Sequence, residues 1–288
     1  MAERLQAIQR RMKSIESTEK IASAMQLVAA AKLKQSTNRF NYTREHIAEM
    51  IDRFEAYMAT QDLDTLDPED VDTREIAPSL TIVITGSKGM CGSYNSSIIK
   101  EMEDVQAMTF FLPLGAKGHE HIVARELPLL EIENKSLYLT PPDESTYPEI
   151  RELAKELTDK QVKREIADIR LLSAKYLNSM AYSVENKLAQ EAYIIEKTPH
   201  IVPYLEEVLA LKIYGAIAEA ALNEYGARRL AMKNASDNAD EMLTDLSMKY
   251  HRARQAQITD ELIEIISGTE SQRSIEEANK KARKKKYE

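Results

Sequence analysis

The chain has few helix-breaking residues, and they are unevenly placed. All nine prolines lie between Pro68 and Pro203, and no glycine precedes Gly86. Proline removes a backbone donor and clashes with the preceding turn, and glycine costs about 1 kcal/mol in a helix interior. Both ends of the chain are therefore predicted to form very long helices. Each would hold about 60 residues and span roughly 90 Å at about 1.5 Å per residue.

Other absences narrow the class of protein. Cys91 is the only cysteine, which excludes an internal disulfide. The absence of tryptophan and the low aromatic content indicate a modest core. No apolar run approaches the roughly 20 residues that cross a bilayer, and the N-terminus lacks the apolar core of a secretory signal. We therefore expect a soluble or peripheral protein without a presequence.

The charge is also unevenly distributed. The net charge of -8 argues against general nucleic-acid binding, yet the last nine residues, KKARKKKYE, are strongly basic. This tail has two interpretations: a solvated helix end, or a contact with an acidic protein or lipid.

In the first segment, apolar residues recur at steps of three, four or seven. They are Leu5, Ile8, Met12, Ile15, Ala22, Met25 and Ala29. This spacing predicts a coiled-coil-like seam, and the small residues Ala22, Ala24, Ala29 and Ala30 imply that the partner helix approaches closely. The pattern ends at the acidic stretch 62–72, which we predict to be a solvated linker.

The middle of the chain alternates between strand-like and helix-like segments. Apolar runs at 80–84, 108–115 and 167–178 predict strands, and 94–105 and 147–163 predict helices. Such alternation indicates a small, mainly parallel sheet. After Pro203 the helical pattern resumes and continues. Its apolar positions are Leu209, Ile213, Ile217, Ala220, Ala221, Tyr225, Leu230, Met242, Leu246, Tyr250, Ile258, Leu262 and Ile265.

The glycine run 86–92, which follows the first predicted strand, is the strongest candidate for chemistry. Its spacing is G-x-x-G-x-x-G, which matches neither a P-loop nor a dinucleotide fingerprint. We therefore favour a strand-to-helix turn, and a phosphate site is the alternative. Cys91 in this run is predicted to be buried and unreactive.

No other arrangement of residues predicts catalysis or metal binding. His119 and His121 are two residues apart, with no third ligand nearby. The acidic stretch lacks the glycine and terminal glutamate of a calcium loop. We predict no catalytic, cofactor-binding or metal-binding residues, and no cofactor.

Four blocks of sequence together resemble the gamma subunit of F-type ATP synthase. They are Thr18–Leu33, Thr81–Asn95, Ala227–Ala239 and Arg252–Gly268, in the order and near the spacing of that family. The resemblance implies an α/β fold with a long antiparallel coiled coil, in which the N- and C-terminal helices pair and a small Rossmann-like α/β domain lies between them. We accordingly predict a coiled-coil helix at 1–60, an acidic linker at 61–78, an α/β foot domain at 79–198, a second coiled-coil helix at 199–269 and a basic tail at 270–288.

The same resemblance implies a function. The family's chain is a non-catalytic rotor shaft that couples proton or sodium flow through the membrane sector to ATP synthesis or hydrolysis. Its implied partners are the alpha and beta subunits, the epsilon subunit and the c-ring, with no nucleic acid and with membrane association only through the complex. The implied location is the cytoplasmic face of a bacterial cell membrane, or alternatively the matrix side of the mitochondrial inner membrane.

The resemblance also implies which residues touch the beta subunit. On the first helix they are Lys20, Met25 and Lys32, and Met25 is equally compatible with plain coiled-coil core. On the last helix they are Arg254, Gln255, Thr259 and Glu261, with Arg254 expected to form charge-assisted bonds to carboxylates.

The chain departs from the family at three points. Ser87 stands where an acidic residue is common and Thr269 where Ala or Ser is common, and the chain continues past the usual end to Glu288. The extension is either a protruding helix or a mobile tail. Two rival functions stay open: a small α/β nucleotide-binding enzyme that dimerises through its terminal helices, and a helical scaffold whose basic tail binds a polyanion.

Overall fold

The computed structural model describes residues 2–58, 60, 77–105, 108–178, 181–192 and 201–284. These residues form two compact units. The terminal unit holds the residues up to Ala24 and those from Asn234 onward, and the central unit holds Met25–Lys233. Most of the predicted acidic linker and the last four residues of the basic tail lie outside the described residues.

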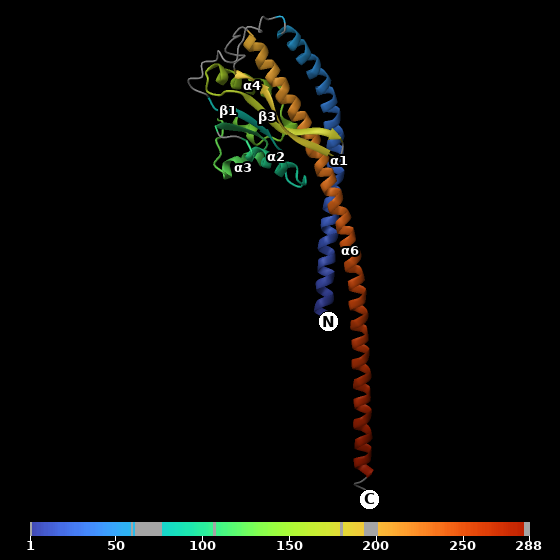
Figure 1. Cartoon of the computed structure of the whole chain (residues 1–288). Coiled ribbons are helices and arrows are strands. Elements are labelled where there is room, and N and C mark those ends of the chain that lie inside the picture. The colour runs from blue at the N-terminus through green and yellow to red at the C-terminus, as the bar shows by residue number, and fades with distance from the viewer. Residues whose placement is uncertain are drawn as a thin grey trace. The chain divides into compact units, whose positions relative to one another are not determined.

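Two long helices, α1 (Ala2–Met58) and α6 (Val202–Lys284), account for about half of the chain (Figure 1). The absence of proline from α1, and from α6 after Pro203, is what permits such lengths. α6 continues to Lys284, so the predicted basic tail is helical as far as that residue.

The two helices pair antiparallel within each unit. In the terminal unit, Gln9 donates a hydrogen bond to the Tyr250 hydroxyl at 3.0 Å, and Ser236 donates to Glu19 at 3.3 Å. In the central unit, the Tyr57 ring lies 5.3 Å from the Tyr204 ring between centroids. The partner residue number falls as the α1 number rises, so the predicted antiparallel pairing is confirmed.

The predicted seam of α1 is largely confirmed. Ala22 and Ala29 are buried, and the other apolar positions of the stripe are half-buried. Ala24, however, is exposed, so its assignment to the seam was wrong. It lies two residues from Ala22, about 200° around the helix, and so faces away from the partner.

The central unit contains a four-stranded mixed sheet in the order β2-β1-β3-β4. The strands are β1 (Ser79–Ile84), β2 (Thr109–Leu114), β3 (Ile169–Asn178) and β4 (Ala181–Gln190). β1 is parallel to both β2 and β3, whereas β3 and β4 form an antiparallel hairpin. The prediction of a mainly parallel sheet is confirmed, and β4 is an additional strand that the sequence analysis did not predict.

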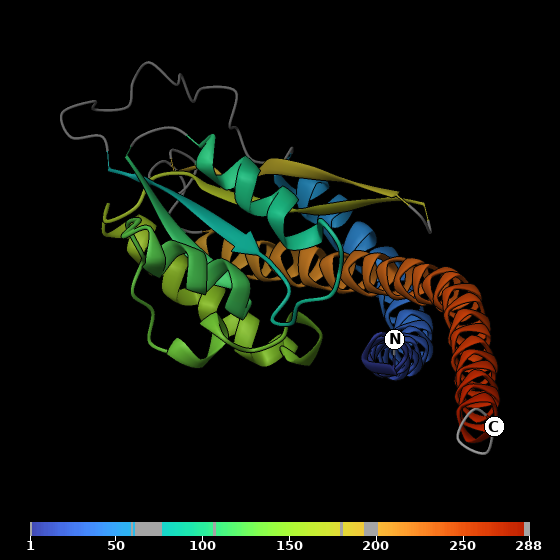
Figure 2. The ribbon, with the colours of Figure 1, turned by 90° about the horizontal axis from the view of Figure 1, so that it is seen from below.

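Helices cover both faces of this sheet (Figure 2). α2 (Tyr94–Glu103) packs through Tyr94 and Ile98 on one face, where Ile122 of α3 (Ala116–Ala124) joins the same cluster. α4 (Tyr147–Val162) and the first part of α6 pack on the other face, with Leu157 and Ile213 fully buried.

Local sequence signals explain where the smaller helices begin. A capping box between Thr146 and Glu149 starts α4, with Pro148 in its first turn. Two short 3-10 helices, η3 (Lys135–Tyr138) and η4 (Pro142–Glu144), precede it. No helix among the described residues has an apolar stretch long enough to span a membrane.

Candidate functional site

The glycine run joins β1 to α2 as a turn, as predicted. A Cβ on Gly86 would lie 2.7 Å from the carboxyl carbon of Glu224, so any larger residue there would displace that side chain. The Gly86 amide donates to Asn95 Oδ1 at 2.9 Å, in the first turn of α2. The turn therefore lies directly against α6.

A buried ion pair on α6 holds this turn. Arg228 Nη2 donates to Glu224 Oε1 at 2.6 Å, and both side chains are less than 10% exposed. The same guanidinium donates to the carbonyl oxygens of Lys88, at 3.1 Å, and Gly89, at 3.2 Å. Burial raises the pKa of Glu224, and the charge of Arg228 opposes that rise.

This arrangement argues against a phosphate site at the glycine run. A phosphate loop presents converging backbone N–H groups to the anion. Here the ordered contacts of Lys88 and Gly89 are made through their carbonyl oxygens, and the Glu224 carboxylate lies under Gly86. A carboxylate in that place would repel a phosphate.

The sequence analysis missed this ion pair. Its signal was present, since Glu224 and Arg228 are four residues apart within a segment where Leu209, Ile213 and Ile217 are apolar. Opposite charges four residues apart in a predicted helix indicate an ion pair along that helix.

Cys91 is buried, as predicted, at 3% exposure. Burial raises the pKa of its thiol, and Asn95 Nδ2 donates to its sulfur at 3.3 Å. His119 stacks on Tyr138, and His121 lies 3.1 Å from a Glu103 oxygen. Across the described ranges, no three His, Cys, Asp or Glu side chains gather as metal ligands do.

Asp143, in η4, joins both long helices within the central unit. Its carboxylate accepts from the Tyr225 hydroxyl at 2.7 Å and from Lys32 Nζ at 3.3 Å. Arg39 donates to its backbone oxygen at 2.7 Å and stacks over the Tyr214 ring at 4.9 Å. The pKa of Tyr225 is raised by burial and by this bond to Asp143. Sequence reasoning missed Asp143, because it lies more than a hundred residues from Lys32.

The other predicted contact residues of α1 differ in their surroundings. Lys20 is exposed and pairs with Glu16, four residues earlier, at 2.9 Å. Met25 is half-buried, which fits partly with each of its two interpretations. Two large exposed apolar side chains follow it, Leu27 and Val28. Lys32, by contrast, is engaged with Asp143.

The four predicted residues of the last helix are all exposed on α6. Thr259 donates to the Gln255 carbonyl at 2.9 Å, and Glu261 accepts from Gln257 at 2.8 Å. Arg254 makes no hydrogen bond or ion pair with another described residue. Its guanidinium is available to an external carboxylate.

Around these residues α6 exposes a series of large apolar side chains. They are Ile258, Leu262, Ile263, Ile265, Ile266 and Ile275. The sequence pattern had placed Ile258, Leu262 and Ile265 on the coiled-coil stripe, and their exposure corrects that expectation. Exposed apolar surface of this extent marks an interaction site.

Comparisons with known proteins agree on one family. A family model described as ATP synthase matches residues 4–271. The ATP synthase gamma chain of Flavobacterium psychrophilum is 30% identical, over 93% of this chain and 98% of that protein. The ATP synthase gamma chain of Geobacter metallireducens is also 30% identical, with the same coverage.

Solved structures share the fold. A chain of the Euglena gracilis mitochondrial ATP synthase, from a structure of its OSCP, F1 and c-ring, aligns with a TM-score of 0.65 at 14% identity. That alignment covers 94% of this chain and 95% of that one. A chain of the central stalk and c-ring of the Tetrahymena thermophila mitochondrial ATP synthase aligns with a TM-score of 0.55 at 22% identity. It covers 75% of this chain and 99% of that one.

Proposed function

The chain belongs to the ATP synthase gamma-chain family, the central-stalk subunits of the F-type enzyme, and we propose that it is the rotor shaft of such a complex. In this role ion flow through a membrane sector turns the chain, and the turning chain drives catalytic subunits through their conformations. The single observation that carries the proposal is the helix α6. It is buried against a folded domain over its first part and presents bare apolar and polar side chains over its last part.

A rotor shaft needs a rigid part and a surface that other subunits contact, and the two parts of α6 suit these two roles. A shaft passes on torque only if its helices brace each other, and the antiparallel pairing of α1 and α6 in each unit provides this bracing. A shaft also needs a surface that other subunits contact in turn. Its effect on them is a difference in contact energy among their conformations.

The partners we propose are those of the relatives. Alpha and beta subunits would surround the exposed part of α6, and the epsilon subunit and c-ring would contact the sheet domain. Arg254 would bind a carboxylate of beta, with Gln255, Thr259 and Glu261 beside it as polar contacts. Lys20 and Met25 would contact beta from α1. Lys32 would act mainly through Asp143, since their ion pair already occupies its ammonium group.

The chain would contribute no catalytic site of its own. The strongest support is the glycine run, where Arg228 takes the loop carbonyls and Glu224 lies beneath Gly86. The chain would be peripheral, held on the cytoplasmic face of a bacterial cell membrane by its partners.

Two measurements on the purified chain test this function. The rotor proposal predicts that the full chain copurifies with alpha and beta subunits when the three are coexpressed. It also predicts that the chain alone gives no calorimetric signal with ATP. ATP binding that is abolished by Gly89→Trp, together with a failure to assemble, would instead support the nucleotide-binding enzyme.

A further inference from the structure

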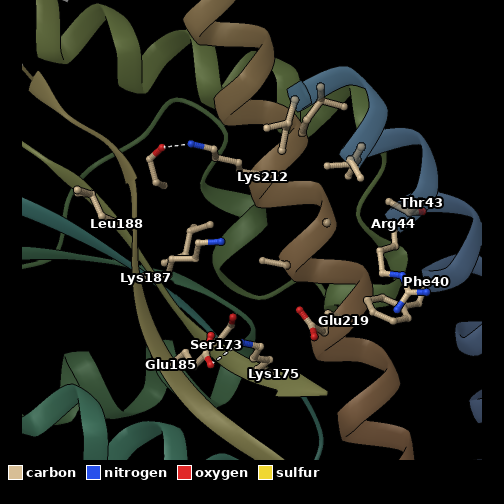
Figure 3. A pocket seen from close by; sticks show the side chains of 18 residues that line it. Phe40, Thr43, Arg44, Ser173, Lys175, Glu185, Lys187, Leu188, Lys212 and Glu219 are labelled. Carbon is tan, nitrogen blue, oxygen red and sulfur yellow. Dashed lines mark hydrogen bonds and ion pairs between the residues drawn. The ribbon is translucent and has the colours of Figure 1, made fainter. Parts of the chain in front are cut away.

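The central unit contains a groove to which the preceding sections assign no role. Its volume is about 350 Å³, and it lies between the β3–β4 hairpin and the two long helices (Figure 3). Cavities that hold small organic ligands range from about 300 to 1,000 Å³ and are mostly apolar with a few polar groups. The groove therefore has the size and character of a small-molecule site.

The two walls of the groove differ in polarity. Phe40, Ile47 and Ile51 of α1 supply an apolar wall. On the opposite wall, Leu171 of β3 pairs with Lys187 of β4, two residues along from the pairing of Ser173 with Glu185. Residues two apart on a strand share a face, so the polar side chains of the hairpin face the apolar wall. The groove is thus amphipathic across its width.

The helices close one side of the groove. A Cβ on Gly215 of α6 would lie 3.1 Å from Ile47 Cδ1, so the backbone of α6 and the side chains of α1 are already in contact there. The remaining volume matches that of a small-molecule cavity.

The residues that line the groove include more basic than acidic side chains. Lys175 pairs with Glu185 at 2.7 Å, and Lys212 donates to the Ala189 carbonyl at 2.7 Å. Glu219 accepts from the Tyr176 amide at 2.8 Å, and burial raises the pKa of its carboxyl group.

Lys187 differs from these residues. Its ammonium group makes no hydrogen bond or ion pair with any residue that the structure describes, although its charge partly opposes the rise in the pKa of Glu219. It extends from β4 toward α6, into the space between the walls (Figure 3). Arg44, whose guanidinium lies over the Phe40 ring at 5.6 Å, adds a second cation at the rim. An anion would satisfy this arrangement.

We propose that the groove binds a small amphipathic anion: one carboxylate attached to an apolar body. The carboxylate pairs with Lys187, and the body lies against Phe40, Ile47 and Ile51. The ion pair gains from the partly dehydrated groove, and the apolar contact contributes in proportion to the area removed from water.

Calorimetric titration of the full chain with decanoate, below the concentration at which it forms micelles, tests the proposal. We expect saturable binding at one site. Lys187→Glu should weaken it at least tenfold, and 1-decanol, the same apolar body without the charge, should bind at least tenfold more weakly. Ala48→Trp, at an exposed helix position that lines the groove, should abolish binding by filling the space.

Lys100→Glu is the matched control, because it makes the same charge reversal on α2, on the other face of the sheet. It should leave affinity within twofold of the unaltered chain. Equal affinity in Lys187→Glu and the unaltered chain, or equal binding of decanoate and decanol, would overturn the proposal. Binding to the bare chain that disappears in the assembled complex would also overturn it, because a partner subunit would then occupy the groove.

Discussion

The two parts of α6 are one continuous helix with opposite relations to solvent. Between Val202 and Lys233 most of its apolar side chains are buried against the sheet domain and α1. From Asn234 onward only Ser236, Ala239 and Leu246 are buried among the described side chains. The first part therefore holds the fold together. The second part has little role in the stability of the isolated chain, so its apolar residues are better explained by partners.

This contrast between the two parts predicts opposite effects of matched substitutions. The largest effect should come from Arg228→Ala, in the buried part, because it leaves the Glu224 carboxylate buried without its cation. Removing one partner of a buried pair costs about 3–5 kcal/mol of folding free energy. Urea denaturation of the purified chain, followed by circular dichroism, measures it.

The control for that experiment is the double variant Arg228→Ala with Glu224→Gln. It removes the charge as well as its partner and should recover part of the loss. If Arg228→Ala alone unfolds at the same urea concentration as the unaltered chain, the ion pair does not hold the glycine turn.

Truncation of one isoleucine in each part tests the contrast directly. Ile217 is fully buried, and Ile217→Ala should cost about 2–5 kcal/mol through lost burial and a cavity. Ile265 is 63% exposed, and Ile265→Ala should change the stability of the chain by less than about 0.5 kcal/mol. The urea denaturation midpoints of both variants measure these two changes in stability. Equal losses would mean that the last part of α6 is packed against something in the chain itself.

Arg254→Ala should leave the chain as stable as before and weaken the complex. A hydrogen bond to a charged group contributes about 1.5–3 kcal/mol, so coupling should fall about tenfold or more if that bond forms during turnover. ATP synthesis by membrane vesicles containing the variant measures this. Unchanged synthesis would remove Arg254 from the contact set, and Lys249→Ala, at an exposed cation that pairs with Asp245, is the control.

A smaller effect is expected from Glu219, a half-buried carboxyl group in the first part of α6. Burial raises the pKa of its carboxyl group above 4.5. Between the pKa of Glu219 in the unfolded chain and its higher pKa in the native chain, the native chain keeps a proton that the unfolded chain has already lost. The free energy of unfolding therefore falls as pH rises through this range. Glu219→Gln should flatten part of this decline as pH rises above about 4.5.

The comparison for that experiment is Glu101→Gln, an exposed position on α2. Urea midpoints across the pH range should keep their full slope in this control. A Glu219→Gln chain with the same slope as the control would show that the Glu219 carboxyl group does not contribute to the pH dependence of stability.

The smallest effect should come from the end of the exposed part. Deletion of Arg273–Glu288 removes most of the basic tail and, among the large apolar side chains that the structure describes as exposed, only Ile275. Assembly should stay intact, and ATP hydrolysis should change by less than about twofold. Subunit composition and hydrolysis rate of the purified complex test this, and loss of assembly would contradict it.

Local sequence patterns predicted much of the fold. The absence of proline and glycine located the long helices, and apolar runs located β1, β2 and β3. β4 was not predicted because its sequence, AYSVENKLAQ, places the polar residues Glu185, Asn186 and Lys187 in the middle of an edge strand. α3 was not predicted because Gly115 precedes its first residue and Gly118 lies within it. A buried face against Thr85 makes glycine favourable there, which no local pattern reveals.

The surroundings of the proposed contact residues could be predicted only in part. The exposure of Arg254 and its neighbours on α6 follows from their polar character. The ion pair of Lys32 with Asp143, by contrast, depends on the folding together of segments that are far apart in the sequence. Sequence spacing also failed at Ile258, Leu262 and Ile265. A stripe of apolar residues predicts a partner but does not say whether that partner belongs to the same chain.

The central claim, that this chain turns inside its complex, can be observed directly. Cys91 is buried with a raised thiol pKa, so in a Lys163→Cys variant a maleimide-linked bead should attach at the exposed new cysteine on the sheet domain. With the alpha and beta subunits fixed to a surface, we predict that the bead rotates in one direction when ATP is added and stops when ATP is removed. A bead that stays still while the same complexes hydrolyse ATP would contradict the account.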